Sequence, residues 1–298
     1  MRLRITHDTH YRYSSPVETS QHMACLQPLD VPGQRLLSHT LQITPDPEQR
    51  QRHVDAFGNA CTYWEMTQSH AQLRVLATST VETSAPAQQL DASGWESVRD
   101  ALRYHAGQTT DPQSRFVFGS HHAPALEEFR QFARPEFGSG RPLQEAAIAL
   151  MRKIHRELRY ESRSTDIHTP ASQALRERRG VCQDFAHILI ACLRSLGLPA
   201  RYESGYLLTA PPPGQARLLG SDASHAWASV YLPALQDKAG AGWLHLDPTN
   251  DRCGWGCPGE DYVRLASGRD FGDVSPLRGV LQGGASHTLE VGVTVEPF

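Results

Sequence analysis

The sequence predicts an α+β protein in which an N-terminal antiparallel β-sandwich precedes a helix packed on an antiparallel sheet. Segments of alternating apolar and polar residues, separated by turn signals, fill the chain to about residue 85. An apolar run with helical spacing occurs much later, at 183–196, and strand-like segments follow it. The 298 residues are enough for two modest domains.

The first region, 1–85, is expected to be the β-sandwich. Leu3 and Ile5, and then Tyr11 and Tyr13, lie in alternating segments. Further segments of this kind occur at 23–26, 37–43, 62–66 and 73–81. Several short strands at this spacing are typical of a small antiparallel sandwich. No cluster of catalytic residue types occurs in these strands, so the active site is expected elsewhere.

Residues 86–140 are expected to be an irregular connecting segment, because prolines interrupt them repeatedly. Short helices are predicted at 95–105 and 125–132. Aromatic residues such as Trp95 and Phe116 need a place to be buried. The segment is therefore expected to wrap over the second domain.

The second domain is expected to span 141–298. A helix is predicted from Pro142 to Leu158, and a buried central helix at 183–196 that ends at Gly197. Strands are predicted at 200–208, 225–232 and 242–247. The tail at 287–295 alternates well and is expected to add a final strand to this domain.

Composition excludes several partners. A formal net charge of −3 gives no electrostatic reason to expect nucleic acid or an anionic membrane. No stretch approaches the roughly 18 apolar residues that span a bilayer, and no apolar stretch follows the charged N-terminal residues. A cytoplasmic location is expected, with all six cysteines reduced. No cofactor is expected. No metal is expected either, because Cys253 and Cys257 lack the spacing of a zinc site.

Cys182 is the candidate nucleophile. Residues 180–187 read GVCQDFAH, which places the cysteine between a turn glycine and the central helix. The N-terminus of a helix carries partial positive charge and unpaired N–H groups, and both favour a thiolate. The backbone N–H of Cys182 is also expected to face a developing oxyanion. Cys192, inside the same helix, is expected to be an inert buried residue.

His225 and Asp247 are the expected partners of this thiol. His225 begins one predicted strand and Asp247 ends the next, so pairing of these strands would make them cross-strand neighbours. An opposite charge about 4 Å from the thiolate, at an effective dielectric constant of about 20, is worth roughly 4 kcal/mol. The helix terminus adds about 0.3–1 kcal/mol. We therefore expect His225 to contribute most of the activation and Asp247 to orient it.

Other polar residues near these motifs are expected to have lesser roles. Asp184 and His187 lie on the opposite face of the helix from Cys182, so a structural role near the site is expected. Tyr160 and Trp227 are candidates for substrate contact, the latter because it shares a strand face with the candidate histidine. His245 shares a face with the candidate aspartate and is a weaker competitor for it.

Three motifs in order resemble the bacterial transglutaminase-like family, whose members are often described as cysteine proteases. They are GVCQDFAH at 180–187, DASHAW at 222–227 and DPTN at 247–250. Residues 2–66 resemble the β-rich N-terminal region of this family, and GRDFGDVSPLRG at 268–279 resembles its C-terminal signature. The resemblance covers most of the chain and implies a papain/transglutaminase-like core.

By the same resemblance, Cys182 would be the nucleophile, His225 the general acid/base and Asp247 the orienting carboxylate. The expected activity is hydrolysis of peptide or isopeptide amide bonds in a peptide or protein substrate, through a thioester. One alternative is an acyltransferase, either an amine-transferring transglutaminase or an arylamine acetyltransferase-like enzyme. Another is a non-catalytic peptide-binding module. No signature of oligomeric state is present. Calcium dependence is not carried over, because no EF-hand-like loop occurs.

Overall fold

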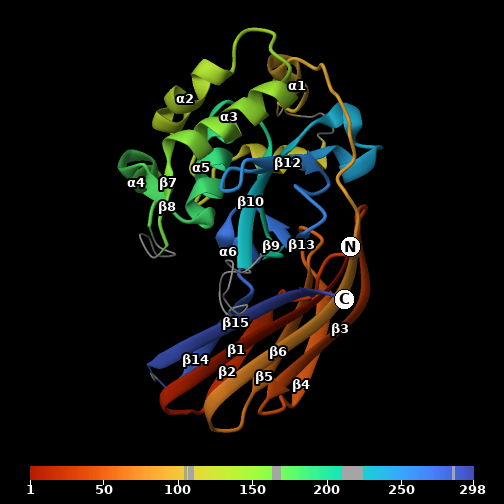
Figure 1. Cartoon of the computed structure of the whole chain (residues 1–298). Helices are drawn as coiled ribbons and strands as arrows, with labels where there is room; N and C mark the ends of the chain where they lie inside the picture. The colour runs from red at the N-terminus through yellow and green to blue at the C-terminus, as the bar shows by residue number, and fades with distance from the viewer. Residues whose placement is uncertain (104–105, 107–110, 163–168, 210–223, 284–285) are drawn as a thin grey trace, which may run out of the picture.

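A β-sandwich lies at one end of the molecule and a mixed core of helices and strands at the other (Figure 1). The computed structural model describes the chain except residues 104–105, 107–110, 163–168, 210–223 and 284–285. The predicted α+β arrangement, with a β-rich N-terminal region before a helix-on-sheet core, is confirmed.

Two four-stranded antiparallel sheets form the sandwich. The long sheet has the order β15 (His287–Pro297), β1 (Arg2–Val17), β6 (His70–Thr83) and β3 (Gln34–Thr44). The short sheet has the order β14 (Leu277–Gln282), β2 (Thr19–Ala24), β5 (Ala60–Met66) and β4 (Gln49–Val54). Odd-numbered residues of β1 and β6 are mostly buried and even-numbered ones mostly are not, as period-two alternation requires.

The C-terminal tail corrects the expected division of the chain. The tail was expected to complete the second domain, but β15 pairs with β1 over Leu3↔Pro297 to Tyr13↔His287, and β14 pairs with β2. The alternation that predicts a strand carries no information about its partner. Both ends of the chain therefore lie in the sandwich, on the same side of the molecule (Figure 1).

A five-stranded antiparallel sheet forms the centre of the core. Its order is β12 (Arg252–Trp255), β11 (Trp243–Asp247), β10 (Ser224–Tyr231), β9 (Ala200–Leu207) and β13 (Tyr262–Gly268). Its helices are α3 (Leu143–Glu157), α4 (Ala171–Glu177), α5 (Cys182–Ser195) and the short α6 (Phe271–Val274). Smaller elements are the paired β7 (Arg159–Tyr160) and β8 (Arg179–Gly180), with 3₁₀ turns η4 (Pro233–Leu235) and η5 (Ala239–Gly242).

Helix α5 is the predicted central helix, because its residues from Asp184 to Arg194 are all buried. It packs on β10 and β9 and against α3, α4 and α2 (Glu127–Ala133). Gly197 follows its C-terminal end with φ of 80°, a left-handed conformation that favours glycine, and ends the helix as expected.

The connecting segment is structured and belongs to the core. It contains α1 (Trp95–Ala101), η1 (Pro112–Val117), α2 (Glu127–Ala133) and η2 (Arg134–Glu136). Trp95, Phe116 and Phe129 are each at most 4% exposed and join the same hydrophobic cluster as α5. Burial of these aromatic rings holds the segment in place, although its sequence shows no regular hydrophobic periodicity.

The sandwich and the core share one hydrophobic cluster, which includes Leu3, Ile5 and Val295 from the long sheet. Two side-chain amides extend this contact along the edge strand β13. Gln34 accepts the N–H of Arg264 at 2.7 Å and donates to its carbonyl at 2.9 Å.

Asn59 makes the same pair of bonds with Ser267, both at 2.8 Å. These amides satisfy backbone groups that an edge strand would otherwise leave unpaired.

Two cysteines of the sandwich form a disulfide, which contradicts the expectation that all six are reduced. Cys25 and Cys61 are bonded across a separation of 36 residues, next to β2 and within β5. The other four, Cys182, Cys192, Cys253 and Cys257, are free thiols. Because two paired strands bring Cys25 and Cys61 together, their spacing in the sequence gives no sign of the bond.

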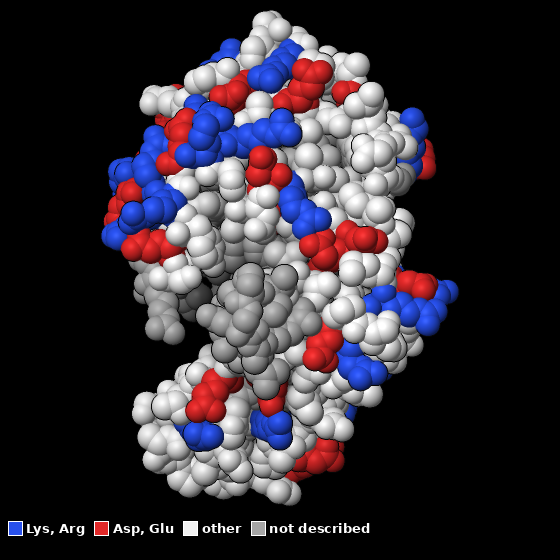
Figure 2. Space-filling model, viewed as in Figure 1, with Lys and Arg blue, Asp and Glu red and all other residues white. Residues whose placement is uncertain are grey.

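The surface seen in Figure 2 mixes charges of both signs. Over the helical part, arginines pair with nearby carboxylates, as in Arg178–Glu157 at 3.0 Å and Arg176–Glu128 at 3.3 Å. Among the described residues, no helix is long and apolar enough to cross a bilayer.

Candidate active site

Cys182 is the first residue of α5 and is half-buried. Strand β8 leads directly into it, and the neighbouring β7 holds β8 in place through parallel pairing of Tyr160 with Gly180. A Cβ at Gly180 would lie 2.7 Å from a carboxylate oxygen of Asp184, so only glycine fits this approach. The thiol therefore has a fixed position at a helix N-terminus, as the sequence predicts.

His225 lies between Cys182 and Asp247, so the structure brings the three predicted residues together. Its Nε2 is 2.7 Å from Oδ2 of Asp247, and its ring is also hydrogen-bonded with the Cys182 side chain. The imidazole is 7% exposed. Burial lowers the pKa of His225, but hydrogen bonds with Asp247 and Cys182, and their charges, outweigh this effect and raise the pKa to about 10. The imidazolium is therefore the favoured form at neutral pH.

Asp247 is fully buried and every described contact favours its charged form. Its Oδ1 accepts the backbone N–H groups of Thr249 at 2.9 Å and Asn250 at 3.3 Å. Its Oδ2 accepts from Nδ2 of Asn250 at 2.8 Å and from the Tyr262 hydroxyl at 2.6 Å, besides facing His225. Burial raises the pKa of Asp247, but these hydrogen bonds and the imidazolium charge lower it below its usual value.

The strand register differs in detail from the expectation. β10 and β11 pair from Tyr231↔Trp243 to Ala228↔Leu246, so Asp247 follows in register opposite Trp227. His225 is therefore a diagonal neighbour of Asp247 rather than a direct one. A hydrogen bond still forms, because diagonal neighbours on one face remain within reach of long side chains.

Sequence reasoning missed Tyr262 and Asn250. Asn250 belongs to the DPTN motif, and its position in the turn after Asp247 is the signal that could have indicated its role. Tyr262 lies at the start of β13, a strand that was not predicted. Its hydroxyl reaches Asp247 because β13 pairs with β9, which pairs with β10, and the Tyr262 ring packs against Trp227 and His225 of β10. No local pattern in the sequence indicates this arrangement.

The expected substrate contact by Trp227 is wrong. Its side chain is 0% exposed, its ring stacks beside His225 with centroids 6.0 Å apart, and Nε1 donates to Nδ1 of His245 at 2.9 Å. The His245 ring therefore contacts Trp227 and Glu203 rather than Asp247. Burial lowers the pKa of His245 well below its usual value. The indole is a buried support for the imidazole.

Tyr160 is exposed and remains a candidate for substrate contact. Its ring meets Phe185 of α5 edge to face at 6.4 Å, close to the start of the helix. The sequence also leads us to expect that the loops at 160–169 and 209–223 set substrate specificity. Residues 163–168 and 210–223 of these loops lie outside the described residues.

Asp184 and His187 contact backbone groups around α5. Oδ2 of Asp184 accepts the N–H of Val181 at 2.8 Å, which fixes the residue before the nucleophile. Nε2 of His187 accepts the N–H of Phe271 at 3.2 Å, and burial lowers the pKa of this imidazole to about 3. A neutral His187 thus ties α5 to the C-terminal signature, where α6 begins.

No metal site is present in the part of the chain that the structure describes, since no group of three or more His, Cys, Asp or Glu side chains converges there. Burial raises the pKa of the Cys253 and Cys257 thiols, which disfavours the thiolate form that a metal requires.

Two family models match the chain. The bacterial transglutaminase-like N-terminal region matches residues 3–82, which form most of the sandwich. The transglutaminase-like superfamily matches residues 130–248, which include Cys182, His225 and Asp247.

Relatives of known sequence and structure match almost the whole chain. An uncharacterized protein of Mycobacterium tuberculosis is 39% identical over 303 residues, which cover 100% of this chain and 93% of that protein. An uncharacterized protein of Mycobacterium leprae is 29% identical over 298 residues, which cover 99% of this chain and 98% of that protein. The crystal structure of a "putative cysteine protease" from Cytophaga hutchinsonii is 25% identical, with a TM-score of 0.70 over 100% of this chain and 91% of that one. The chain therefore belongs to the transglutaminase-like superfamily and has the bacterial transglutaminase-like N-terminal region.

Proposed function

We propose that this protein is a cysteine hydrolase that cleaves peptide or isopeptide amide bonds through a thioester. The observation that carries the proposal is the position of His225, which contacts the Cys182 thiol and the buried Asp247 carboxylate together. An imidazolium whose pKa is raised to about 10 stabilises a thiolate beside it and can later donate its proton.

The proposed reaction has two halves. The Cys182 thiolate attacks the amide carbon, the C–N bond breaks, and His225 transfers its proton to the leaving amine, which leaves a thioester. The neutral imidazole then takes a proton from water, whose oxygen attacks the thioester and releases the acid and the thiolate. The first N–H groups of α5 would face the oxyanion in both halves. Asp247 would hold the imidazole in place throughout.

Iodoacetamide labelling tests the nucleophile before any substrate is known. Alkylation at neutral pH, followed by mass spectrometry of the peptides, should modify Cys182 much faster than Cys253. Both are half-buried free thiols, but only Cys182 contacts an imidazole. The His225→Asn variant should alkylate at least about tenfold more slowly. Equal rates at the two cysteines would refute the assignment.

A peptide library then tests the reaction. Cleavage should be present in the wild type and in the Cys253→Ala control, and absent in Cys182→Ala. Adding dansylcadaverine as a labelled amine distinguishes hydrolysis from acyl transfer, because only a transferase converts the thioester to a labelled amide. A protein that binds library peptides without either reaction would instead be a binding module, and the proposal would be wrong.

A further inference from the structure

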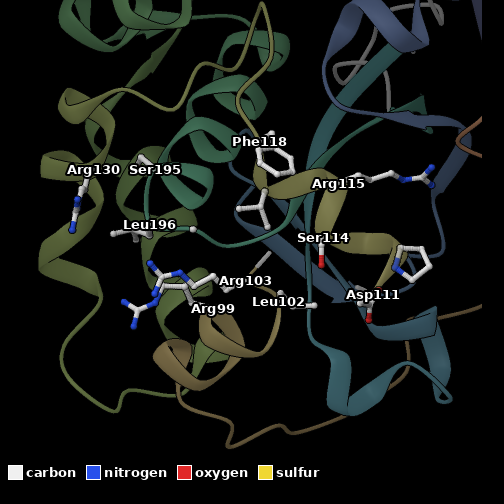
Figure 3. Close-up of a pocket in the computed structure, with 13 residues that line it drawn as sticks. Arg99, Leu102, Arg103, Asp111, Ser114, Arg115, Phe118, Arg130, Ser195 and Leu196 are labelled. Atoms are coloured by element: carbon white, nitrogen blue, oxygen red, sulfur yellow. The ribbon is translucent and has the colours of Figure 1, made fainter. Parts of the chain in front are cut away.

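A second cavity lies at the opposite end of α5 from Cys182. Its volume is about 800 Å³, and α1, η1, α2 and the C-terminal end of α5 surround it. Figure 3 shows these elements and the side chains that they project toward it. The 14 residues of α5 separate it from the thiol by about 20 Å at 1.5 Å per residue. It is therefore distinct from the candidate active site.

Basic side chains dominate the polar part of this cavity. Arg99, Arg103, Arg115 and Arg130 line it, against one carboxylate, Asp111. The Asp111 carboxylate already has hydrogen-bond donors within the protein. It accepts the N–H of Gln113 at 2.8 Å and the hydroxyl of Tyr231 at 3.1 Å.

The four arginines are not equivalent. Arg115 donates to the carbonyl of Ala56 at 2.8 Å and is directed away from the cavity (Figure 3). Arg99 pairs with Asp100 at 2.8 Å. Arg103 and Arg130 form no ion pair within 4.0 Å with any residue that the structure describes. Arg103, which follows α1, and Arg130 of α2 thus bring two positive charges to the cavity without an ion pair within 4.0 Å among the described residues.

The end of α5 is shaped around these side chains. A Cβ at Gly197 would lie 3.1 Å from Cγ of Arg99, so the glycine leaves room for the arginine to cross the helix terminus. Figure 3 shows the guanidinium groups of Arg99, Arg103 and Arg130 on one side of the cavity, around Leu196. Planar guanidinium groups grouped in this way match the oxygen atoms of a carboxylate or phosphate.

The remaining wall is apolar, with one unsatisfied hydroxyl. Leu102, Leu196 and Phe118 supply hydrocarbon surface, and Phe118 is 61% exposed. Ser114 is 8% exposed, and its hydroxyl has no hydrogen-bond partner among the described residues. Figure 3 shows this hydroxyl directed between Leu102 and Asp111. A buried hydroxyl without a partner is unfavourable, and a polar ligand atom would satisfy it.

We propose that this cavity binds a small organic anion. Its carboxylate or phosphate group would lie against Arg103, Arg130 and Arg99, and its apolar part against Leu196 and Phe118. A mostly apolar cavity with a few convergent polar groups is the usual form of a small-molecule site. The positive charge selects an anion, and the hydrocarbon wall selects an organic anion over an inorganic one.

Calorimetric titration with two probes tests this site. Phenyl phosphate should bind with a dissociation constant of about 1 mM or lower, and inorganic phosphate several-fold more weakly because it lacks the ring. The double variant Arg103→Gln/Arg130→Gln should weaken phenyl phosphate at least about tenfold. Both side chains are exposed, so the variant should keep the unfolding temperature of the wild type. Arg52→Gln, an exposed arginine of β4, is the matched control and should bind as the wild type does.

Three results would overturn the proposal. The first is that phenyl phosphate does not bind at about 10 mM. The second is that phenyl phosphate and inorganic phosphate bind with equal affinity. The third is that the double variant binds phenyl phosphate as tightly as the wild type does. The readout is binding alone, so it does not depend on the proposed hydrolysis.

Discussion

Tyr262 donates a hydrogen bond of 2.6 Å to Oδ2 of Asp247, the same oxygen that faces Nε2 of His225 at 2.7 Å. The tyrosine is 1% exposed, and burial together with Asp247 raises the pKa of its hydroxyl. It therefore stays neutral and donates to Asp247, while it accepts a longer hydrogen bond from Nδ2 of Asn250 at 3.5 Å. Tyr262 therefore positions the imidazole in two ways: it fixes the carboxylate, and its ring lies edge to face against that of His225 with centroids 5.9 Å apart.

Replacing Tyr262 with Phe should lower kcat/KM about three- to tenfold without unfolding the protein. One hydrogen bond to a charged acceptor is worth about 1.5–3 kcal/mol. Because Asn250 continues to hold the same oxygen, only part of that energy, about 0.7–1.4 kcal/mol, should be lost from the transition state. The measurement is hydrolysis of a peptide selected by its Cys182-dependent cleavage. Tyr206→Phe is the matched control, because its buried hydroxyl bonds to His7 rather than to the site. Equal losses in the two variants would mean that Tyr262 is only a packing residue.

Asp247→Asn should lower kcat/KM by roughly 10²- to 10⁴-fold, the usual range for disrupted acid–base catalysis. The carboxylate supplies a hydrogen bond and a charge that both raise the pKa of His225, so this pKa should fall below its wild-type value of about 10. NMR titration of labelled histidine measures the shift directly. Glu128→Gln, which removes a partner of Arg176 on the helical surface, is the control and should leave the His225 titration unchanged.

The same pKa shift predicts how His225 contributes to stability. Its pKa is higher in the folded protein, about 10, than the ordinary value of 6.5. The folded state therefore holds the proton more tightly, and the stabilisation is complete below pH 6.5 and lost as the pH rises through 10. The difference in unfolding free energy between the wild type and His225→Gln should shrink over that interval. A difference that grows with pH would contradict the ion pair.

Local motifs were sufficient to predict the three residues of the candidate site, because each lies at a recognisable end of a helix or strand. Cys182 begins α5, His225 lies at the start of β10, and Asp247 ends β11. What could not be predicted depends on which strands pair. Tyr262 reaches the site only through the position of β13 beside β9.

The same reasoning explains the two errors about the sandwich. Alternation at 287–295 predicts a strand but not its partner, and β1 lies more than 270 residues earlier in the chain. Cys25 and Cys61 meet because β2 pairs with β5, a contact that neither cysteine's neighbours indicate. Trp227 was misread for a different reason. Period-two alternation correctly places it on the face of His225, but that face is covered at this position.

Removing the disulfide should destabilise the sandwich. Closure of a loop by residues 36 apart is worth about 4 kcal/mol in the chain-entropy model. Denaturant unfolding of the Cys25→Ser/Cys61→Ser variant should show a loss of about that size, and dithiothreitol should affect only the wild type. Cys257→Ser, at a free buried thiol, is the control.

Trapping thiols with an alkylating agent in intact cells then tests the expected cytoplasmic location, where Cys25 and Cys61 would be reduced.

Gln34 and Asn59 should hold the sandwich on the core through β13, the strand that carries Tyr262. Each amide satisfies a backbone N–H and a carbonyl, of Arg264 and Ser267 respectively. Gln34→Ala removes the side-chain partner of the Arg264 N–H, whereas the Arg264 carbonyl keeps the N–H of Leu29 at 3.1 Å. Asn59→Ala removes the side-chain partners of both Ser267 groups, and each group left buried without a partner costs about 1–3 kcal/mol. Gln34→Ala and Asn59→Ala should each lower the unfolding free energy by about 2 kcal/mol or more, measured by denaturant unfolding. Gln42→Ala, exposed on the same strand as Gln34, should change it by less than about 0.5 kcal/mol.

The double variant distinguishes a shared role from two separate ones. Arg264 and Ser267 are three residues apart on β13, so loss of one amide should loosen the strand that the other holds. The two losses should then depart from additivity by about 0.5–3 kcal/mol in a double-mutant cycle. Strict additivity would mean that the amides act independently and that the sandwich is held mainly by the hydrophobic contacts of Leu3, Ile5 and Val295.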